Sequence, residues 1–234
     1  MFDASVYIQR RKKLKEQLGS GLVLLIGNEE SPMNYPANPF HFRQDSSFLY
    51  FFGLDFPNLA GVIDIDNDKD IIFGDDLTID DVVWTGPQPT IADRSAKVGI
   101  SETYPFGDLE RIVKSAQKVH FLPQYFHAVM IKMEGLLGIH PNKLNENASV
   151  DLIKAVVAQR NIKSDEEIKE MELAGDIAYE MHTYAMRMTR PGMMESEISG
   201  KVEGIALSKG LGVSFLLYSL SMDKPFIIIT TATS

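Results

Sequence analysis

The sequence contains no cysteine among its 234 residues. Without thiols the chain cannot form disulfides, use a cysteine nucleophile or bind a metal through thiolates. Long apolar runs are also missing, since no stretch approaches the roughly 20 residues that cross a bilayer. Residues 1–17 carry basic side chains without the apolar core of a secretory signal. These absences predict a cytoplasmic protein that does not bind a membrane.

Basic residues are scarce as well. The chain has 23 lysines and arginines against 32 aspartates and glutamates, a formal net charge of −9. Phosphate contacts need clustered Lys and Arg, so the composition predicts no nucleic-acid partner. The run Arg10-Arg11-Lys12-Lys13 falls within an amphipathic helix predicted for residues 3–18. There it is expected to form a solvated helix face.

The apolar fraction of 44% is enough for a sizeable core. Strands and helices alternate over residues 3–160, which predicts an α/β domain with a mixed sheet flanked by helices. Strands are predicted at residues 22–26, 61–65, 70–73 and 119–122, and helices at 3–18, 91–98, 109–117 and 150–160. Residues 29–40 are predicted as a loop and 66–69 as a hairpin turn.

The chain is organised around residues 41–53, where a polar cluster runs into an aromatic block. Arg43, Gln44 and Asp45 precede residues 48–52, whose apolar side chains alternate on both faces. This pattern predicts a strand buried on both sides, with Gly53 permitting a sharp exit.

His127 and His140 have no partner at metal-ligand spacing. His120 is expected to be a hydrogen-bonded residue of a buried strand, and His182 to lie at a surface or an interface. His127 and His140 carry no assignment.

A joint at residues 161–164 separates the first domain from two further helices. Ser164 is a suitable N-cap, and Glu167 three residues later completes a capping box. Apolar residues recur at helical spacing over residues 165–188 and again over 195–208. Arg190-Pro191-Gly192 ends the first of these helices.

Three groups of residues, in this order and spacing, resemble the Xaa-Pro aminopeptidases, relatives of prolidase and creatinase. They are Tyr35-Pro36 with Phe42-Arg43-Gln44-Asp45-Ser46 and an aromatic run to Gly53; Trp84-Thr85-Gly86 with Gly99; and Arg160 to Ser164 with Glu166, Glu167 and Arg190-Pro191-Gly192. Residues 37–41 stand as an insertion in the first group. The resemblance covers residues 1–215.

The resemblance implies a domain of the creatinase and aminopeptidase P type at residues 1–160. It implies the first two helices of a pita-bread domain at 161–215. The complete family enzyme removes the first residue from peptides with proline in second position, by a hydroxide that bridges two metal ions, usually Mn²⁺. Its N-terminal domain supports oligomers, so a homo-oligomer is expected.

The family's metal ligands are two aspartates, one histidine and two glutamates. No residue between 165 and 234 matches a ligand motif, so this chain is expected to bind no Mn²⁺ and to be inactive. No catalytic or metal-ligating residue is therefore predicted. The family-signature residues are expected to be structural or at an interface: Arg43, Gln44, Asp45, Tyr50, Gly53, Trp84, Gly86, Arg190, Pro191 and Gly192.

Residues 216–234 depart from the family. Residues 226–230 suit a strand, because they are rich in β-branched side chains. The favoured hypothesis is a frameshift that truncates the chain before the metal ligands, since permitted codons in a displaced frame restore an Asn-Gly and a Leu-His pair of the family kind. Two other identities stay open for the chain as a whole: a non-catalytic binding or oligomerisation domain, and a relative of prolidase or creatinase.

Overall fold

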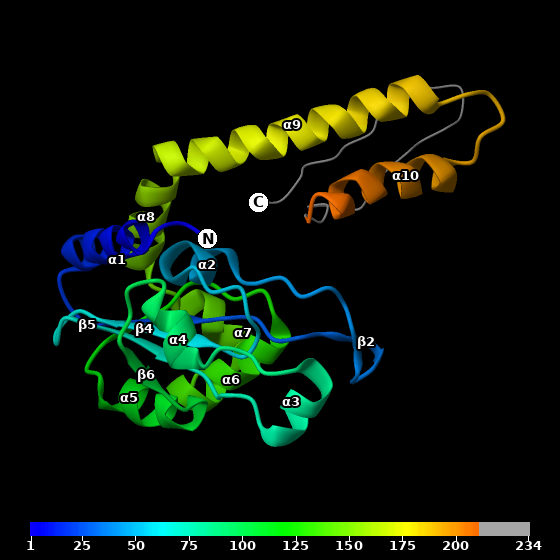
Figure 1. Ribbon diagram of the computed structural model, residues 1–234. Helices are drawn as coiled ribbons and strands as arrows, with labels where there is room; N and C mark the ends of the chain where they lie inside the picture. Colours follow the sequence, from blue (N-terminus) through cyan, green and yellow to red (C-terminus); the bar gives the residue numbers. More distant parts are fainter. Residues whose placement is uncertain (211–234) are drawn as a thin grey trace. The chain divides into compact units, whose positions relative to one another are not determined.

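The computed structural model describes residues 1–210, which divide into two units, 1–162 and the part of the chain from residue 163 onward (Figure 1). The tail at 216–234, with its predicted strand and its frameshift hypothesis, lies outside the described residues. The helices of the first unit are α1 (Ala4–Leu18), α2 (Ser46–Phe52), α3 (Ile79–Thr85), α4 (Ile91–Ala96), α5 (Leu109–Ser115), α6 (His127–Leu137), α7 (Pro141–Leu144) and α8 (Val150–Arg160).

The first unit is built on a five-stranded mixed sheet in the order β6-β5-β4-β1-β7. Its strands are β1 (Leu22–Ile26), β4 (Ala60–Asp64), β5 (Lys69–Phe73), β6 (Glu102–Tyr104) and β7 (Val119–His120). β4 pairs antiparallel with both β1 and β5, whereas β6 and β7 join the two outer sides in parallel. The predicted α/β fold with a mixed sheet is confirmed.

Helices cover both faces of the sheet, so β1 is buried along its whole length. Alternate β1 residues enter two cores: Val23 and Leu25 pack with α1, α2 and α8, and Leu22, Leu24 and Ile26 pack with α5, α6 and α7. Figure 1 shows these two helical layers on opposite sides of the strands.

The aromatic block predicted as a strand is instead helix α2. Asp45 caps the helix by accepting from the backbone N–H groups of Ser47 and Phe48, each at 2.9 Å. Phe48, Phe51 and Phe52 follow helical spacing, and all three are 0% exposed. The strand prediction was wrong because a run that is apolar at every position fits both periods, and the cap decides between them.

Gly53 ends α2 in the left-handed conformation, with φ of 64°. A Cβ at this position would lie 2.3 Å from Cζ of Tyr7, which is buried on α1. The sharp exit predicted for Gly53 is confirmed, and glycine is required there by packing as well as by backbone conformation.

The basic run on α1 is only half solvated, so the predicted solvated face was wrong for two of its residues. Lys12 and Lys13 are exposed, but Arg10 is buried and Arg11 is 0% exposed. Arg11 is stabilised there because Asp70 on β5 and three backbone carbonyl oxygens accept from its guanidinium.

The predicted loop at 29–40 contains a small antiparallel ribbon of β2 (Pro32–Tyr35) and β3 (Asn38–Pro39). Tyr35 pairs with Asn38 across a tight turn that begins with Pro36, a position where the fixed φ of proline is favourable. The loop prediction was therefore wrong in part.

The second unit contains α9 (Asp165–Met188) and α10 (Glu195–Ser208), which pack against each other. Their contact is a small apolar core that includes Ile177, Met181 and Val202. The predicted capping box is present, since Ser164 accepts from Glu167 N–H and Glu167 accepts from Ser164 N–H. The break between the helices lies at residues 189–194, as predicted.

Candidate functional site

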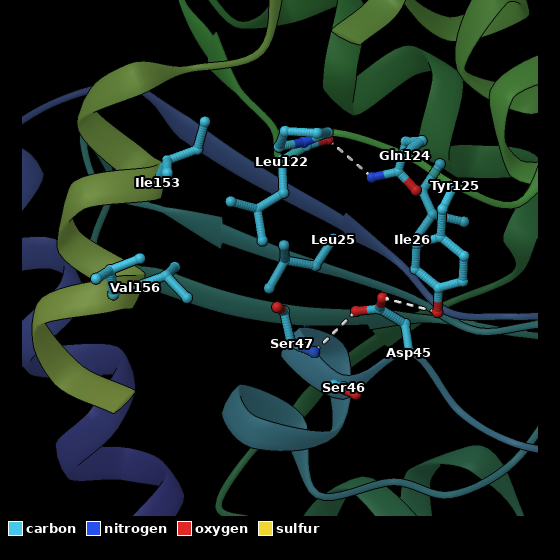
Figure 2. Close-up of a pocket in the computed structure, with 12 residues that line it drawn as sticks. Leu25, Ile26, Asp45, Ser46, Ser47, Leu122, Gln124, Tyr125, Ile153 and Val156 are labelled. Atoms are coloured by element: carbon cyan, nitrogen blue, oxygen red, sulfur yellow. Dashed lines mark hydrogen bonds between the residues drawn. The ribbon is translucent and has the colours of Figure 1, made fainter. Parts of the chain in front are cut away.

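A cleft of about 420 Å³ opens in the first unit, where four segments of the chain meet (Figure 2). These segments are the end of β1, the start of α2, the loop that follows β7, and one side of α8. The lining residues are Leu25, Ile26, Asp45, Ser46, Ser47, Leu122, Pro123, Gln124, Tyr125, Ile153, Val156 and Val157. The cleft therefore has an apolar floor and a polar rim.

Gln44 fixes the loop that leads into α2. Its side-chain oxygen accepts from the backbone N–H of Asn28 at 2.8 Å and of Asp45 at 2.9 Å. Its amide nitrogen donates to the carbonyl oxygens of Leu54 and Phe56. Gln44 is 4% exposed, so this network is shielded from water and holds the rim in one conformation.

Gly27, at the end of β1, allows the close approach of Gln44. A Cβ on this glycine would lie 2.9 Å from the Gln44 side-chain oxygen. Asn28 also fixes this loop, because its side-chain Nδ2 donates to the carbonyl oxygen of Arg43 at 2.9 Å.

Asp45 is the polar centre of the rim. One carboxylate oxygen, Oδ1, accepts the two N–H groups that cap α2. The other, Oδ2, accepts from the Tyr125 hydroxyl at 3.4 Å, a contact drawn in Figure 2. Tyr125 Oη in turn accepts from Asn28 Nδ2 at 3.3 Å.

Burial raises the pKa of the Tyr125 phenol, and the negative charge of Asp45 raises it further. The hydrogen bond from Asn28 acts in the opposite direction by stabilising the phenolate. Tyr125 therefore remains a neutral hydroxyl near neutral pH and acts as a donor toward Asp45. The Asp45 carboxylate beside the neutral Tyr125 hydroxyl suits the binding of a polar group.

The family-signature residues divide between the cleft and other places. Asp45 lines the cleft, and Gln44 supports it from behind. Arg43 is exposed, and its expected structural or interface role stays a prediction. Tyr50 lies on α2 with its ring 3.9 Å from the guanidinium carbon of Arg10, which is a structural contact.

The remaining signature residues lie away from the cleft. Trp84 is on α3 and is 89% exposed, and Gly86 ends that helix with φ of 74°. In the second unit Arg190 donates to the carbonyl oxygens of Arg187 and Thr189, close to the turn at Pro191 and Gly192. The structure brings only Gln44 and Asp45 together at one site.

His120 is buried in β7 and fully hydrogen-bonded, as expected. Its Nδ1 lies 2.7 Å from Ser149 Oγ and its Nε2 lies 3.1 Å from the Ser20 carbonyl oxygen. Because a carbonyl can only accept, the proton of the neutral ring belongs on Nε2. Burial lowers the pKa of His120, so the ring is held neutral.

Within residues 1–210, no group of three or more His, Asp or Glu side chains could hold a metal ion. The described residues do not fit a two-metal centre. Over the same part of the chain, no helix is long and apolar enough to cross a membrane.

Sequence reasoning missed Tyr125, Ser47 and Gln124, although all three line the cleft. Tyr125 is 80 residues from Asp45 in sequence, and no motif or spacing connects the two. Helices α6 and α7, which follow this loop, were also not predicted.

Comparison with known proteins places this geometry in context. Residues 7–120 match the family model described as the aminopeptidase P N-terminal domain. The chain is similar to the Xaa-Pro aminopeptidase of Escherichia coli K12, with 27% identity over 208 residues that cover 83% of this chain and 47% of the relative. It is also similar to the human Xaa-Pro dipeptidase, with 26% identity over 86% of this chain and 41% of that protein.

Solved structures agree on the fold. The aminopeptidase PepP of Pseudomonas aeruginosa matches with a TM-score of 0.76 and 20% identity, over 91% of this chain and 50% of that one. Aminopeptidase P from E. coli in its low pH form matches with a TM-score of 0.74 and 24% identity, over 90% and 50%. The chain thus spans about half, or less, of the length of these relatives.

Proposed function

We propose that this chain, whose residues 7–120 form an aminopeptidase P N-terminal domain, provides the N-terminal domain of a peptidase that releases the first residue of peptides with proline in second position. The observation that carries the proposal is the family match in the first unit, continued by curated relatives along 83% to 89% of the chain. The names of these relatives supply the substrate class.

The first unit would then have a supporting role. The cleft described above contains a capping carboxylate and a phenol, and the described residues do not fit the two metal ions expected for the family enzyme. We expect the 234-residue chain alone to release no first residue from such peptides when Mn²⁺ is added, because its residues match no family ligand motif. Metal-dependent release by this chain would contradict that part of the proposal.

A chimera tests the positive part of the proposal. Residues 1–210 of this chain would be fused to the portion of the E. coli Xaa-Pro aminopeptidase that the chain does not match. The readout is the release of the first residue from an Xaa-Pro peptide with Mn²⁺ present. We expect release by the chimera and none by the E. coli portion alone.

A second chimera makes failure informative. It carries the corresponding half of the Haemophilus influenzae Xaa-Pro aminopeptidase, a relative that is 27% identical to this chain over 199 residues. If that control is active while ours folds, binds metal and releases nothing, this chain does not provide such a domain.

Self-association also belongs to the proposal. Helix α3 exposes Ile79, Val83 and Trp84, with at least 75% of each side chain in solvent. Apolar side chains clustered on one short helix often mark a contact surface. We propose that α3 contributes to contacts between copies of the chain.

A further inference from the structure

We propose that the cleft beside α2 binds the ammonium group of a small apolar amine, with Asp45 as its acceptor. This site is separate from peptide hydrolysis and does not depend on the proposed function. Three features of the cleft support this site: the two Asp45 oxygens accept different numbers of hydrogen bonds, the rim is held in one conformation, and the floor is apolar.

The Asp45 carboxylate has unused acceptor capacity on one oxygen. Oδ1 is occupied by two backbone donors at 2.9 Å. Oδ2 has a single described partner, the Tyr125 hydroxyl, at a distance of 3.4 Å that is long for an O–H···O bond. A charged donor placed in the cleft would make a shorter and stronger bond to Oδ2.

The acceptor is held in place before any ligand arrives. Gln44 accepts from the backbone of Asp45, and Asn28 secures Arg43, the residue two positions before it. Helix capping fixes the Asp45 side chain itself. A ligand would therefore meet a preformed site and lose little free energy in ordering it.

The floor favours an apolar body on the amine. Figure 2 shows Leu25, Leu122, Ile153 and Val156 on the side of the cleft away from the Tyr125 hydroxyl. A volume of about 420 Å³ is within the range of small-molecule sites. The floor would bury a branched alkyl group by the hydrophobic effect.

The negative charge of Asp45 favours a ligand with an ammonium group over one with a carboxylate. Asp45 is the only charged residue among those that line the cleft. Arg160 lies near the rim, where it donates to Ser47 Oγ at 3.4 Å, so a cation is disfavoured at that end. The ammonium would therefore bind at the Tyr125 end of the Asp45 carboxylate.

Two sources share this chemistry: the N-terminus of a peptide and a free alkyl amine. Leucinamide represents the first and isopentylamine the second, since both carry an ammonium and the same branched alkyl group. N-acetyl-leucinamide keeps that alkyl group and removes the positive charge. A preference between the first two compounds identifies the source.

The test is a titration followed by amide chemical shifts of the full chain. We expect both amines to produce saturable shifts around Asp45 and Tyr125, and N-acetyl-leucinamide to produce none. Asp45→Asn should weaken binding at least tenfold, because asparagine keeps the helix cap but loses the charge. Asp80→Asn, on exposed α3, is the matched control and should leave binding unchanged.

Val157→Trp provides a second variant that leaves Asp45 untouched. Val157 lines the cleft and is 49% exposed, so a larger ring there should fill the cleft and block both amines. The proposal is overturned if neither amine gives saturable shifts, or if the acetylated compound binds equally well. It is also overturned if Asp45→Asn or Val157→Trp binds the amines as the parent chain does.

Discussion

Replacing Arg11 with methionine tests the most heavily buried charge in the first unit. The Arg11 side chain is 0% exposed, and its Nε lies 2.8 Å from Asp70 Oδ2. Its remaining nitrogens donate to the carbonyl oxygens of Phe51 at 2.9 Å and Val98 at 3.0 Å. The guanidinium therefore joins α1 to the end of α2, to the segment after α4 and to β5.

Two effects determine the size of the loss. Removing one partner of a buried ion pair costs roughly 3–5 kcal/mol, because it leaves the other charge and its hydrogen-bonding groups unsatisfied. Lys15 partly compensates, since its Nζ also lies 2.9 Å from Asp70. We therefore expect Arg11→Met to lower the free energy of unfolding by about 3 kcal/mol, at the low end of that range.

Urea unfolding of the full chain measures this loss. Lys12→Met is the matched control, because Lys12 is the next residue on the same helix and is exposed. It should change the free energy of unfolding by less than about 0.5 kcal/mol. Arg11→Lys should lie between the two, since lysine keeps the charge but cannot reproduce the planar fork. A loss below about 1 kcal/mol in the free energy of unfolding for Arg11→Met would refute the reasoning. Removing one partner of a buried, hydrogen-bonded ion pair should cost more than that.

Three further predictions follow from the described residues. Burial lowers the pKa of His120, so stability should fall as the pH drops below 6.5, the unfolded value, and His120→Gln should flatten this dependence in urea midpoints. Gly53→Ala should lower the free energy of unfolding by roughly 1–3 kcal/mol in the same assay. The φ of 64° is unfavourable for alanine, and a Cβ would collide with the Tyr7 ring. Trp84 is the only tryptophan, so the fluorescence of the chain reports on α3. Its emission should shift to the blue as protein concentration rises, because contacts between copies would bury the ring; a constant spectrum would argue against α3 as a contact surface.

Local signals explain what could be predicted from the sequence. β1, α8 and α10 begin and end where the apolar periods predicted, and the Ser164–Glu167 capping box is present. These features depend on residues within one or two helical turns, or on one strand. Periodicity and caps are sufficient for them.

Long-range partners explain what could not be predicted. Arg11 is buried because Asp70, 59 residues away, lies beside it, and the basic run alone gives no sign of this. The cleft depends on Tyr125 reaching Asp45 over 80 residues. Helix α2 was predicted as a strand because the apolar run fits both periods, and the Asp45 cap that decides between them is one residue of a polar cluster.

The proposed function is tested most directly by the substrate preference of the chimera that joins residues 1–210 to the unmatched part of the E. coli enzyme. The measurement compares kcat/KM for two peptides that differ only in having proline or alanine in second position. We expect the proline peptide to be preferred at least about tenfold, since differential contacts with a single ring are worth that much. Equal rates on the two peptides, or no release in a chimera that folds and binds metal, would contradict the proposal.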